Sequence, residues 1–117
     1  MSAVKSAAGG AARVASQGEC MFRHVVLLKW TEDATEEQRA EVARRLGGLP
    51  DVIPELRAYQ IGSDAGVNQG NFSFAVVADF DSAEDYVVYR DHPAHRAVID
   101  ECITPILAAR AAVQYVL

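Results

Sequence analysis

The sequence predicts one α+β domain, a four-stranded antiparallel sheet with its helices packed on one face. Three observations predict it. A long apolar strand pattern begins just after residue 21, helical patterns with capping residues follow it, and further strand patterns lie between the helices and end the chain. In order, the elements are β-α-β-β-α-α-β, which is the ferredoxin-like arrangement. Right-handed crossovers place the first and third strands in the middle of the sheet.

Length and charge limit what the protein can be. The chain has 117 residues, 50% of them hydrophobic, and a formal net charge of −5. This length suits one domain, and the negative charge argues against nucleic-acid or anionic-membrane partners, which need a basic surface. No apolar run is long enough to span a bilayer. Cys20 and Cys102 follow no metal spacing, so we expect free thiols in a reducing cytoplasm.

The first twenty residues differ in composition from the rest. Residues 1–20 are rich in Ala, Gly and Ser and contain few large apolar side chains. Such a segment buries too little surface to offset the entropy lost on ordering. We therefore expect a flexible N-terminal tail at 1–20 and a folded domain at 21–117.

The first strand is expected at Phe22–Trp30. Alternate residues share a face, so His24 and Trp30 lie on one side and Val25 and Leu27 on the other. The run Val25–Leu28 is apolar throughout, which is typical of a strand covered on both faces.

A helix is expected to follow this strand. Thr35 and Gln38 have the spacing of a capping box, in which each side chain satisfies a backbone N–H at the helix start. The helix should run to about Leu46, because Gly47–Gly48 favours termination and Pro50 cannot continue it.

Three further strand patterns complete the predicted sheet. Leu56–Gly62 and Asn71–Phe80 are joined by a short loop rich in Gly, Asn and Asp, so we expect an antiparallel hairpin. Ala111–Leu117 is expected to be the last strand.

Two consecutive helices are expected between the third and fourth strands. Asp81–Glu84 carries capping residues for the first of them. Pro93 cannot continue that helix but suits the first turn of a new one, so His92 lies at the junction. Pro105 should kink the second helix or end its regular part.

The helices cover only one face of this sheet. The opposite face would expose the apolar side chains of Val25, Leu27, Ala75 and Val77. The simplest cover is the same face of a second copy, so the sequence predicts a homodimer that associates through its sheet faces.

The segment Tyr86–His95 contains the densest group of residues suited to chemistry. His95 lies on the apolar stripe of its helix and should point toward the sheet, while His24 lies on the helix-covered face of the first strand. A histidine in such a place is either a hydrogen-bonded core residue or a general acid or base in a cavity. Tyr89 can turn inward beside His95 and donate to a carbonyl or an oxyanion, or it can be an edge of the core.

Other classes of site have weaker support. Asp91, His92 and His95 offer metal-ligand side chains, but His92 lies outside the helix and no established zinc spacing is present. No Gly-rich phosphate loop follows a strand, and no serine hydrolase motif occurs. We therefore expect no metal and no cofactor.

Together, these residues resemble the Dabb family, the stress-responsive dimeric α/β-barrel domain. The resemblance covers 21–117 and is carried by three motifs: His24–Lys29 in the first strand, Ile53–Pro54 before the second, and Tyr89-x-x-His92-Pro93-x-His95 before the last helix. It implies a ferredoxin-like protomer whose sheet packs face to face against that of a partner, forming a dimeric α/β barrel.

The family includes plant polyketide cyclases that close a linear polyketide by aldol condensation without a cofactor. The resemblance implies that His24, Tyr89 and His95 match the cavity histidines and tyrosine of those cyclases. It also marks two departures: Phe74 stands where the cyclases have a third-strand histidine, and Leu46 where they have a first-helix tyrosine. Both changes imply a more apolar pocket.

Three functional hypotheses follow. The first is a cofactor-free cyclase or lyase-type enzyme that acts on a polyketide-like or aromatic carbonyl compound, with His24, Tyr89 and His95 as catalytic residues. Its substrate pocket is expected to include Trp30, Phe72, Phe74, Tyr86, His92 and Ile99. The second is a stress-responsive protein that binds a small molecule without turnover. The third is a cofactor-free monooxygenase.

Overall fold

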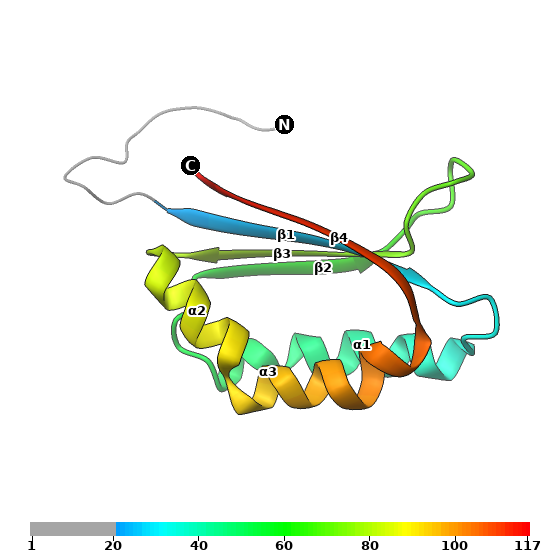
Figure 1. Ribbon diagram of the computed structural model, residues 1–117, viewed down its shortest axis with the longest axis horizontal. Coiled ribbons are helices and arrows are strands. Elements are labelled where there is room, and N and C mark those ends of the chain that lie inside the picture. Colours follow the sequence, from blue (N-terminus) through cyan, green and yellow to red (C-terminus); the bar gives the residue numbers. More distant parts are fainter. Residues whose placement is uncertain (1–20) are drawn as a thin grey trace.

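The computed structural model describes residues 21–117, and the predicted tail at 1–20 lies outside the described residues. Within this part the regular elements follow the predicted order (Figure 1). The strands are β1 (Phe22–Trp30), β2 (Ala58–Ser63), β3 (Phe74–Phe80) and β4 (Leu107–Val116), and the α-helices are α1 (Glu36–Gly47), α2 (Ala83–Asp91) and α3 (Pro93–Val98).

The sheet has the predicted topology. Its strands lie in the order β2-β3-β1-β4, and every neighbouring pair is antiparallel. The first and third strands therefore occupy the centre, as the crossover rule predicts. All the helices lie on one side of the sheet, which confirms the ferredoxin-like α+β arrangement (Figure 1).

The strand boundaries are less regular than the sequence pattern. The third strand begins at Phe74 rather than Asn71, because Ser73 makes other bonds: its N–H donates to the Leu28 carbonyl and its hydroxyl accepts from the Trp30 N–H. The last strand begins at Leu107, four residues earlier than predicted, since β1 continues to pair with it as far as Trp30.

The first helix begins as predicted. The Thr35 hydroxyl accepts from the Gln38 N–H at 3.1 Å, and the Gln38 side chain accepts from the Thr35 N–H at 2.9 Å. These two bonds confirm the capping box. The inner face of α1 buries Val42 and Leu46 against the core.

The last helical region changes its winding twice. His92 separates α2 from α3, and its ring nitrogen Nδ1 accepts from the Ala94 N–H at 3.1 Å. The α-helix ends at Val98 and continues as one π turn, Ile99–Ile103, followed by a 3₁₀ turn, Thr104–Ile106. Regular α-helix therefore ends well before Pro105, which removes a backbone donor from the next turn.

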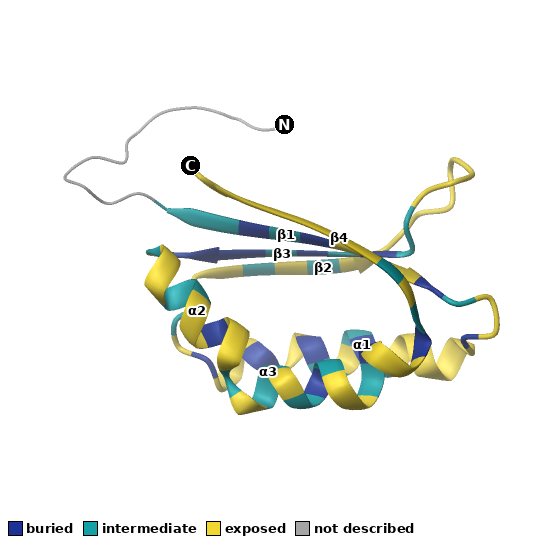
Figure 2. Cartoon of the chain, viewed as in Figure 1, coloured by how far each residue is buried: buried dark blue, intermediate teal, exposed yellow. Residues whose placement is uncertain are grey.

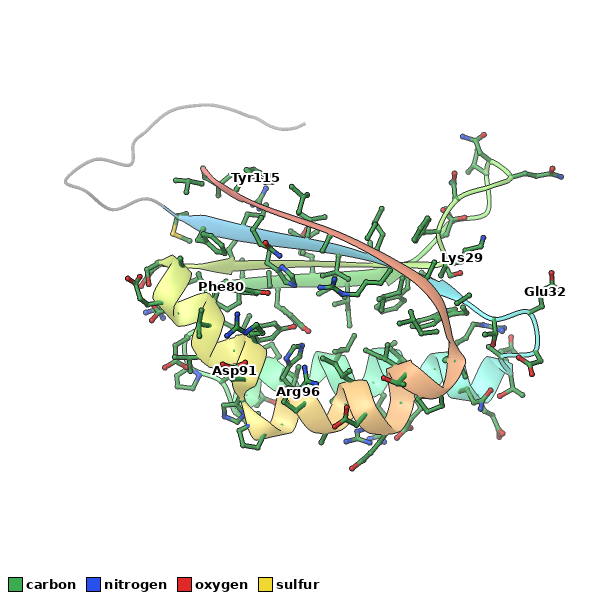
Figure 3. All side chains as sticks on the ribbon, viewed as in Figure 1. Lys29, Glu32, Phe80, Asp91, Arg96 and Tyr115 are labelled. Carbon is green, nitrogen blue, oxygen red and sulfur yellow. The ribbon has the colours of Figure 1, made fainter. Side chains whose placement is uncertain are left out.

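The face of the sheet away from the helices is open to solvent and largely apolar. Leu27, Val113 and Tyr115 are 39%, 55% and 44% exposed, and strand β4 is exposed along nearly its whole length (Figure 2). Tyr115 stands on this open side of the sheet in Figure 3. Among residues 21–117, no helix has the length and apolarity needed to cross a bilayer.

Candidate active site

A cavity lies between the helix-facing side of the sheet and helices α2 and α3. Its volume is about 310 Å³, at the lower end of the roughly 300–1,000 Å³ typical of small-molecule pockets. Side chains from the sheet and from the helices both point into this space (Figure 3). One of them is Arg96, which lies on α3 and is labelled in the figure. The apolar lining residues are Val26, Leu28, Leu46, Val76, Ile99, Ile103 and Leu107, and the polar ones are His24, Tyr86, Tyr89, Arg90, His95, Arg96 and Arg110.

The register of the sheet places one row of residues beneath α2. Strand β1 puts His24 opposite Ala78 of β3 and opposite Gln114 of β4, and Ala78 is in turn opposite Tyr59 of β2. Residues directly opposite in antiparallel strands share a face. The row therefore brings Gln114 to the histidine and places Tyr59 two strands away on the same face, although both are far from it in sequence.

His24 is a buried, neutral imidazole with one nitrogen already bonded. The amide Nε2 of Gln114 donates to its Nδ1 at 2.8 Å. Burial, together with the positive charge of Arg110 and the proximity of His95, lowers the pKa of His24 to about 4. With Nδ1 accepting, the single proton of the neutral ring is on Nε2, so His24 is a hydrogen-bond donor at this site.

His95 holds its proton on the other nitrogen. Its Nδ1 lies 3.1 Å from the backbone carbonyl oxygen of Arg90, which can only accept a hydrogen bond, so Nδ1–H is the donor. The ring stacks on Tyr89, with 4.1 Å between centroids. Burial lowers the pKa of His95 below its usual value. Nε2 therefore carries the free lone pair, and His95 is a hydrogen-bond acceptor and a base.

The Tyr89 hydroxyl is paired with a second phenol and is not free for a ligand. Tyr89 is only 2% exposed, and its hydroxyl is 3.2 Å from that of Tyr59. Burial raises the pKa of the Tyr89 phenol far above its usual range and that of Tyr59 to about 12. Tyr89 thus contributes the ring on which His95 stacks, while its hydroxyl pairs with another phenol.

Tyr86 has the hydroxyl group that is available. Its ring lies 4.7 Å from the His24 ring, centroid to centroid, and the residue lines the cavity. Within residues 21–117, the Tyr86 hydroxyl makes no hydrogen bond to another group. It is therefore free to donate to a ligand in the cavity.

The structure places four of the predicted pocket residues elsewhere. Trp30 and Phe74 pack on each other, with 6.0 Å between ring centroids, in the core at the other end of the sheet. Phe72 precedes β3 and borders a shallow hollow beside Leu27. His92 caps α3, so its side chain is committed at the helix start. Of the six predicted wall residues, the cavity includes Tyr86 and Ile99, and Leu46 lines it too.

Sequence reasoning missed three arginines and a glutamine at this site. Arg90 and Arg96 come from the helices, and Arg110 and Gln114 from β4. The alternation Arg110-x-x-x-Gln114 places both β4 residues on the face that carries His24. The predicted strand begins at Ala111 and therefore leaves out Arg110, although the spacing to Gln114 is visible in the sequence.

The three candidate metal ligands, Asp91, His92 and His95, do not form a common site. Asp91 pairs with Arg90 at 2.9 Å, while Nδ1 of His92 and Nδ1 of His95 bond to backbone groups. Within the part of the chain that the structure describes, no three His, Cys, Asp or Glu side chains form a potential metal site.

The two tyrosines should respond differently to loss of a hydroxyl. Tyr89→Phe leaves the Tyr59 phenol without its partner, so we expect the free energy of unfolding to fall by about 1–3 kcal/mol. Tyr86→Phe removes a hydroxyl that has no partner among the described residues and should change stability by less than about 0.5 kcal/mol. Urea unfolding of both variants and the parent measures this. Equal losses in the two variants would contradict the assignment.

Comparisons with known proteins agree with this architecture. The family model described as the stress responsive A/B barrel domain, Dabb, matches residues 22–117. Olivetolic acid cyclase from Cannabis sativa is 31% identical over 77 residues, covering 62% of this chain and 74% of that protein.

Two solved structures are also similar. A dimeric ferredoxin-like protein of unknown function from Thermobifida fusca is 43% identical with a TM-score of 0.79, covering 90% of this chain and 97% of the other. Hydroxynitrile lyase from Passiflora edulis is 20% identical with a TM-score of 0.73, covering 83% of this chain and 93% of the other. At that lower identity, the similarity shows a shared fold.

Proposed function

Because the chain belongs to the Dabb family of stress responsive A/B barrel domains, we propose that its cavity performs cofactor-free acid–base catalysis on a small carbonyl compound. The substrate class is aromatic or polyketide-like, in keeping with the apolar walls. The observation that carries the proposal is the pair of hydrogen-bond partners of two imidazoles at one cavity, a backbone carbonyl at His95 and an amide NH₂ at His24, which assigns them opposite tautomers. His95 presents a lone pair, and His24 presents an N–H.

Each imidazole is suited to one half of an enolisation. Nε2 of His95 removes a proton from the carbon beside a carbonyl. The electron pair of that C–H bond forms the C=C bond of the enolate, and the π pair of the carbonyl moves to its oxygen. Nε2–H of His24 donates to the oxygen as it becomes negative, and the Tyr86 hydroxyl is available as a second donor. Because the His24 ring is neutral and protonated on Nε2, it can donate a hydrogen bond to this oxygen without any change in its own charge.

The enolate then reacts as a carbon nucleophile. Attack of its carbon on a second carbonyl of the same molecule forms a C–C bond and closes a ring. The new alkoxide then takes back the proton that His95 holds, which restores the base. The cyclase named among the relatives supports this direction of reaction, as does a cavity whose walls are mostly apolar.

Deuterium uptake tests the proposal without knowledge of the natural substrate. The parent protein is incubated in D₂O with a panel of neutral aromatic ketones that begins with 1-phenylpropan-2-one, and exchange beside the carbonyl is followed by NMR. We expect exchange above the buffer rate that disappears in His95→Gln. Binding of panel members with no exchange would overturn the proposal and favour ligand binding without turnover.

We also propose that the protein is a homodimer whose two sheets pack face to face. Leu27 and Val113 are exposed on the open face, beside Val25 and Ala111 of the same two strands. A contiguous apolar face of this kind is typical of an interface. The Thermobifida fusca relative is described as dimeric, which supports the same arrangement here.

A charge placed in the centre of this face should separate the protomers. We expect Leu27→Glu to shift the mass from twice 12.6 kDa to 12.6 kDa, because a buried unpaired carboxylate costs several kcal/mol per copy. Val88→Glu is the matched control, since Val88 is 44% exposed but lies on α2. Light scattering at micromolar concentration measures the mass. A monomeric parent, or a dimeric Leu27→Glu, would contradict the proposed interface.

A further inference from the structure

We infer that the cavity selects carbonyl compounds that carry a carboxylate, and that Arg110 binds this group. The inference rests on the proposed function, because it names the substrate class of the same site. It assigns Arg110 as the residue that holds the anionic end of the substrate while the carbonyl end lies at His24 and His95.

The charges around the cavity are unusual for this protein. The chain as a whole has a net charge of −5. Nevertheless, the described residues that line the cavity include Arg90, Arg96 and Arg110 and no Asp or Glu. A pocket lined by one sign of charge attracts a ligand of the opposite sign.

The three guanidinium groups differ in their partners. Arg90 forms a two-bond pair with Asp91, with distances of 2.9 and 3.1 Å. Arg96 faces Asp100 at 3.9 Å. Arg110 forms no ion pair with any residue between 21 and 117. Among the described residues, Arg110 is therefore the lining cation with no carboxylate within 4.0 Å, and its donors are available for a ligand.

The register of the sheet places Arg110 on the same face as His24. It pairs with Leu28 in the register that pairs His24 with Gln114, so both rows lie on the helix-facing side. The two rows are four residues apart on β1, or roughly 13 Å. Between them on β4 is Ala112, whose methyl group leaves space on that face. The charge of Arg110 also acts on His24 directly.

A carboxylate matches these features better than a doubly charged group. One free guanidinium provides the parallel donors that a carboxylate accepts in a bidentate pair. The rest of the cavity is mainly aliphatic and aromatic, which suits the carbon skeleton of an aromatic or polyketide-like keto acid. The occupant we infer is such a keto acid as its monoanion.

The test uses two ligands of the same shape, 2-naphthoate and 2-naphthamide, measured by titration calorimetry at low ionic strength. We expect the parent to bind the carboxylate about tenfold or more tightly than the amide. Arg110→Gln should reduce this preference to less than about twofold while leaving the affinity for the amide unchanged, and Arg110→Lys should retain part of it. Arg44→Gln, on the exposed side of α1, is the control for loss of one positive charge.

The binding results test the role of Arg110 independently of the proposed proton-transfer reaction. Equal binding of the two ligands by the parent would overturn it, as would an Arg110→Gln variant that keeps the preference. Exchange of 1-phenylpropan-2-one requires His95 but no carboxylate. Exchange without a charge preference would therefore leave the proposed function standing and remove only the role of Arg110. A preference for the carboxylate without deuterium exchange would support the role of Arg110 in binding and contradict the proposed catalytic function.

Discussion

Replacing His95 with Gln should lower the rate of proton removal from a bound ketone by about 10²–10⁴-fold. The reason is that the amide has no basic nitrogen, whereas Nε2 of His95 is an unprotonated base fixed by the Arg90 carbonyl. Ligand affinity should change by less than about threefold, because the side chain keeps its polarity and approximate size. Deuterium exchange of 1-phenylpropan-2-one and calorimetry on the same samples measure both quantities.

His92→Gln is the matched control for this variant. Both histidines belong to the same helix entrance, but His92 caps α3 and does not line the cavity. We expect its exchange rate to stay within about threefold of the parent. If His92→Gln lost as much activity as His95→Gln, the effect would come from disruption of the helix, and the assignment of His95 as base would fail.

Acid should destabilise the fold through His24. In the unfolded chain this residue takes up a proton as the pH falls through 6.5, whereas the folded pKa is about 4. Between these values the unfolded state binds more protons, so stability is lost as the pH falls from 6.5 and the loss is complete near 4. This difference between the unfolded and folded pKa corresponds to about 3 kcal/mol in the free energy of unfolding.

The His24→Gln variant isolates this contribution. Gln cannot titrate, so its free energy of unfolding should depend less on pH, and the difference between parent and variant should change mainly between pH 6.5 and 4. Urea unfolding at fixed protein concentration across this range gives the curve. An NMR titration of the His24 ring in the folded protein is the independent check. A midpoint near 6.5 would contradict the burial and contacts described for this residue.

Much of the fold could be predicted from local patterns. Alternation in Phe22–Trp30 and the capping box at Thr35 depend on neighbours in the sequence, and both agree with the structure. The early start of β4 at Leu107 could not be predicted in this way. Residues 107–112 include four alanines and one arginine, a composition with weak strand preference, and they become a strand because β1 offers a partner.

The site was predictable only as far as the direction of side chains. The apolar stripe around His95 and the strand face of His24 indicated that both rings point between the sheet and the helices, and in the structure both line one cavity. The bond from Gln114 and the pairing of Tyr59 with Tyr89 depend on strand register, which joins residues far apart in sequence. For that reason the sequence suggested Tyr89 as the hydroxyl donor, whereas the structure leaves Tyr86 free for that role.

The two cavity histidines should carry their protons on opposite nitrogens. Long-range ¹H–¹⁵N NMR spectra of the imidazole rings at pH 7.5 test it directly, since protonated and unprotonated ring nitrogens have distinct shifts. We expect His95 to be protonated on Nδ1 and His24 on Nε2, both rings being neutral. The same tautomer in both rings, or a charged ring at this pH, would contradict the claim.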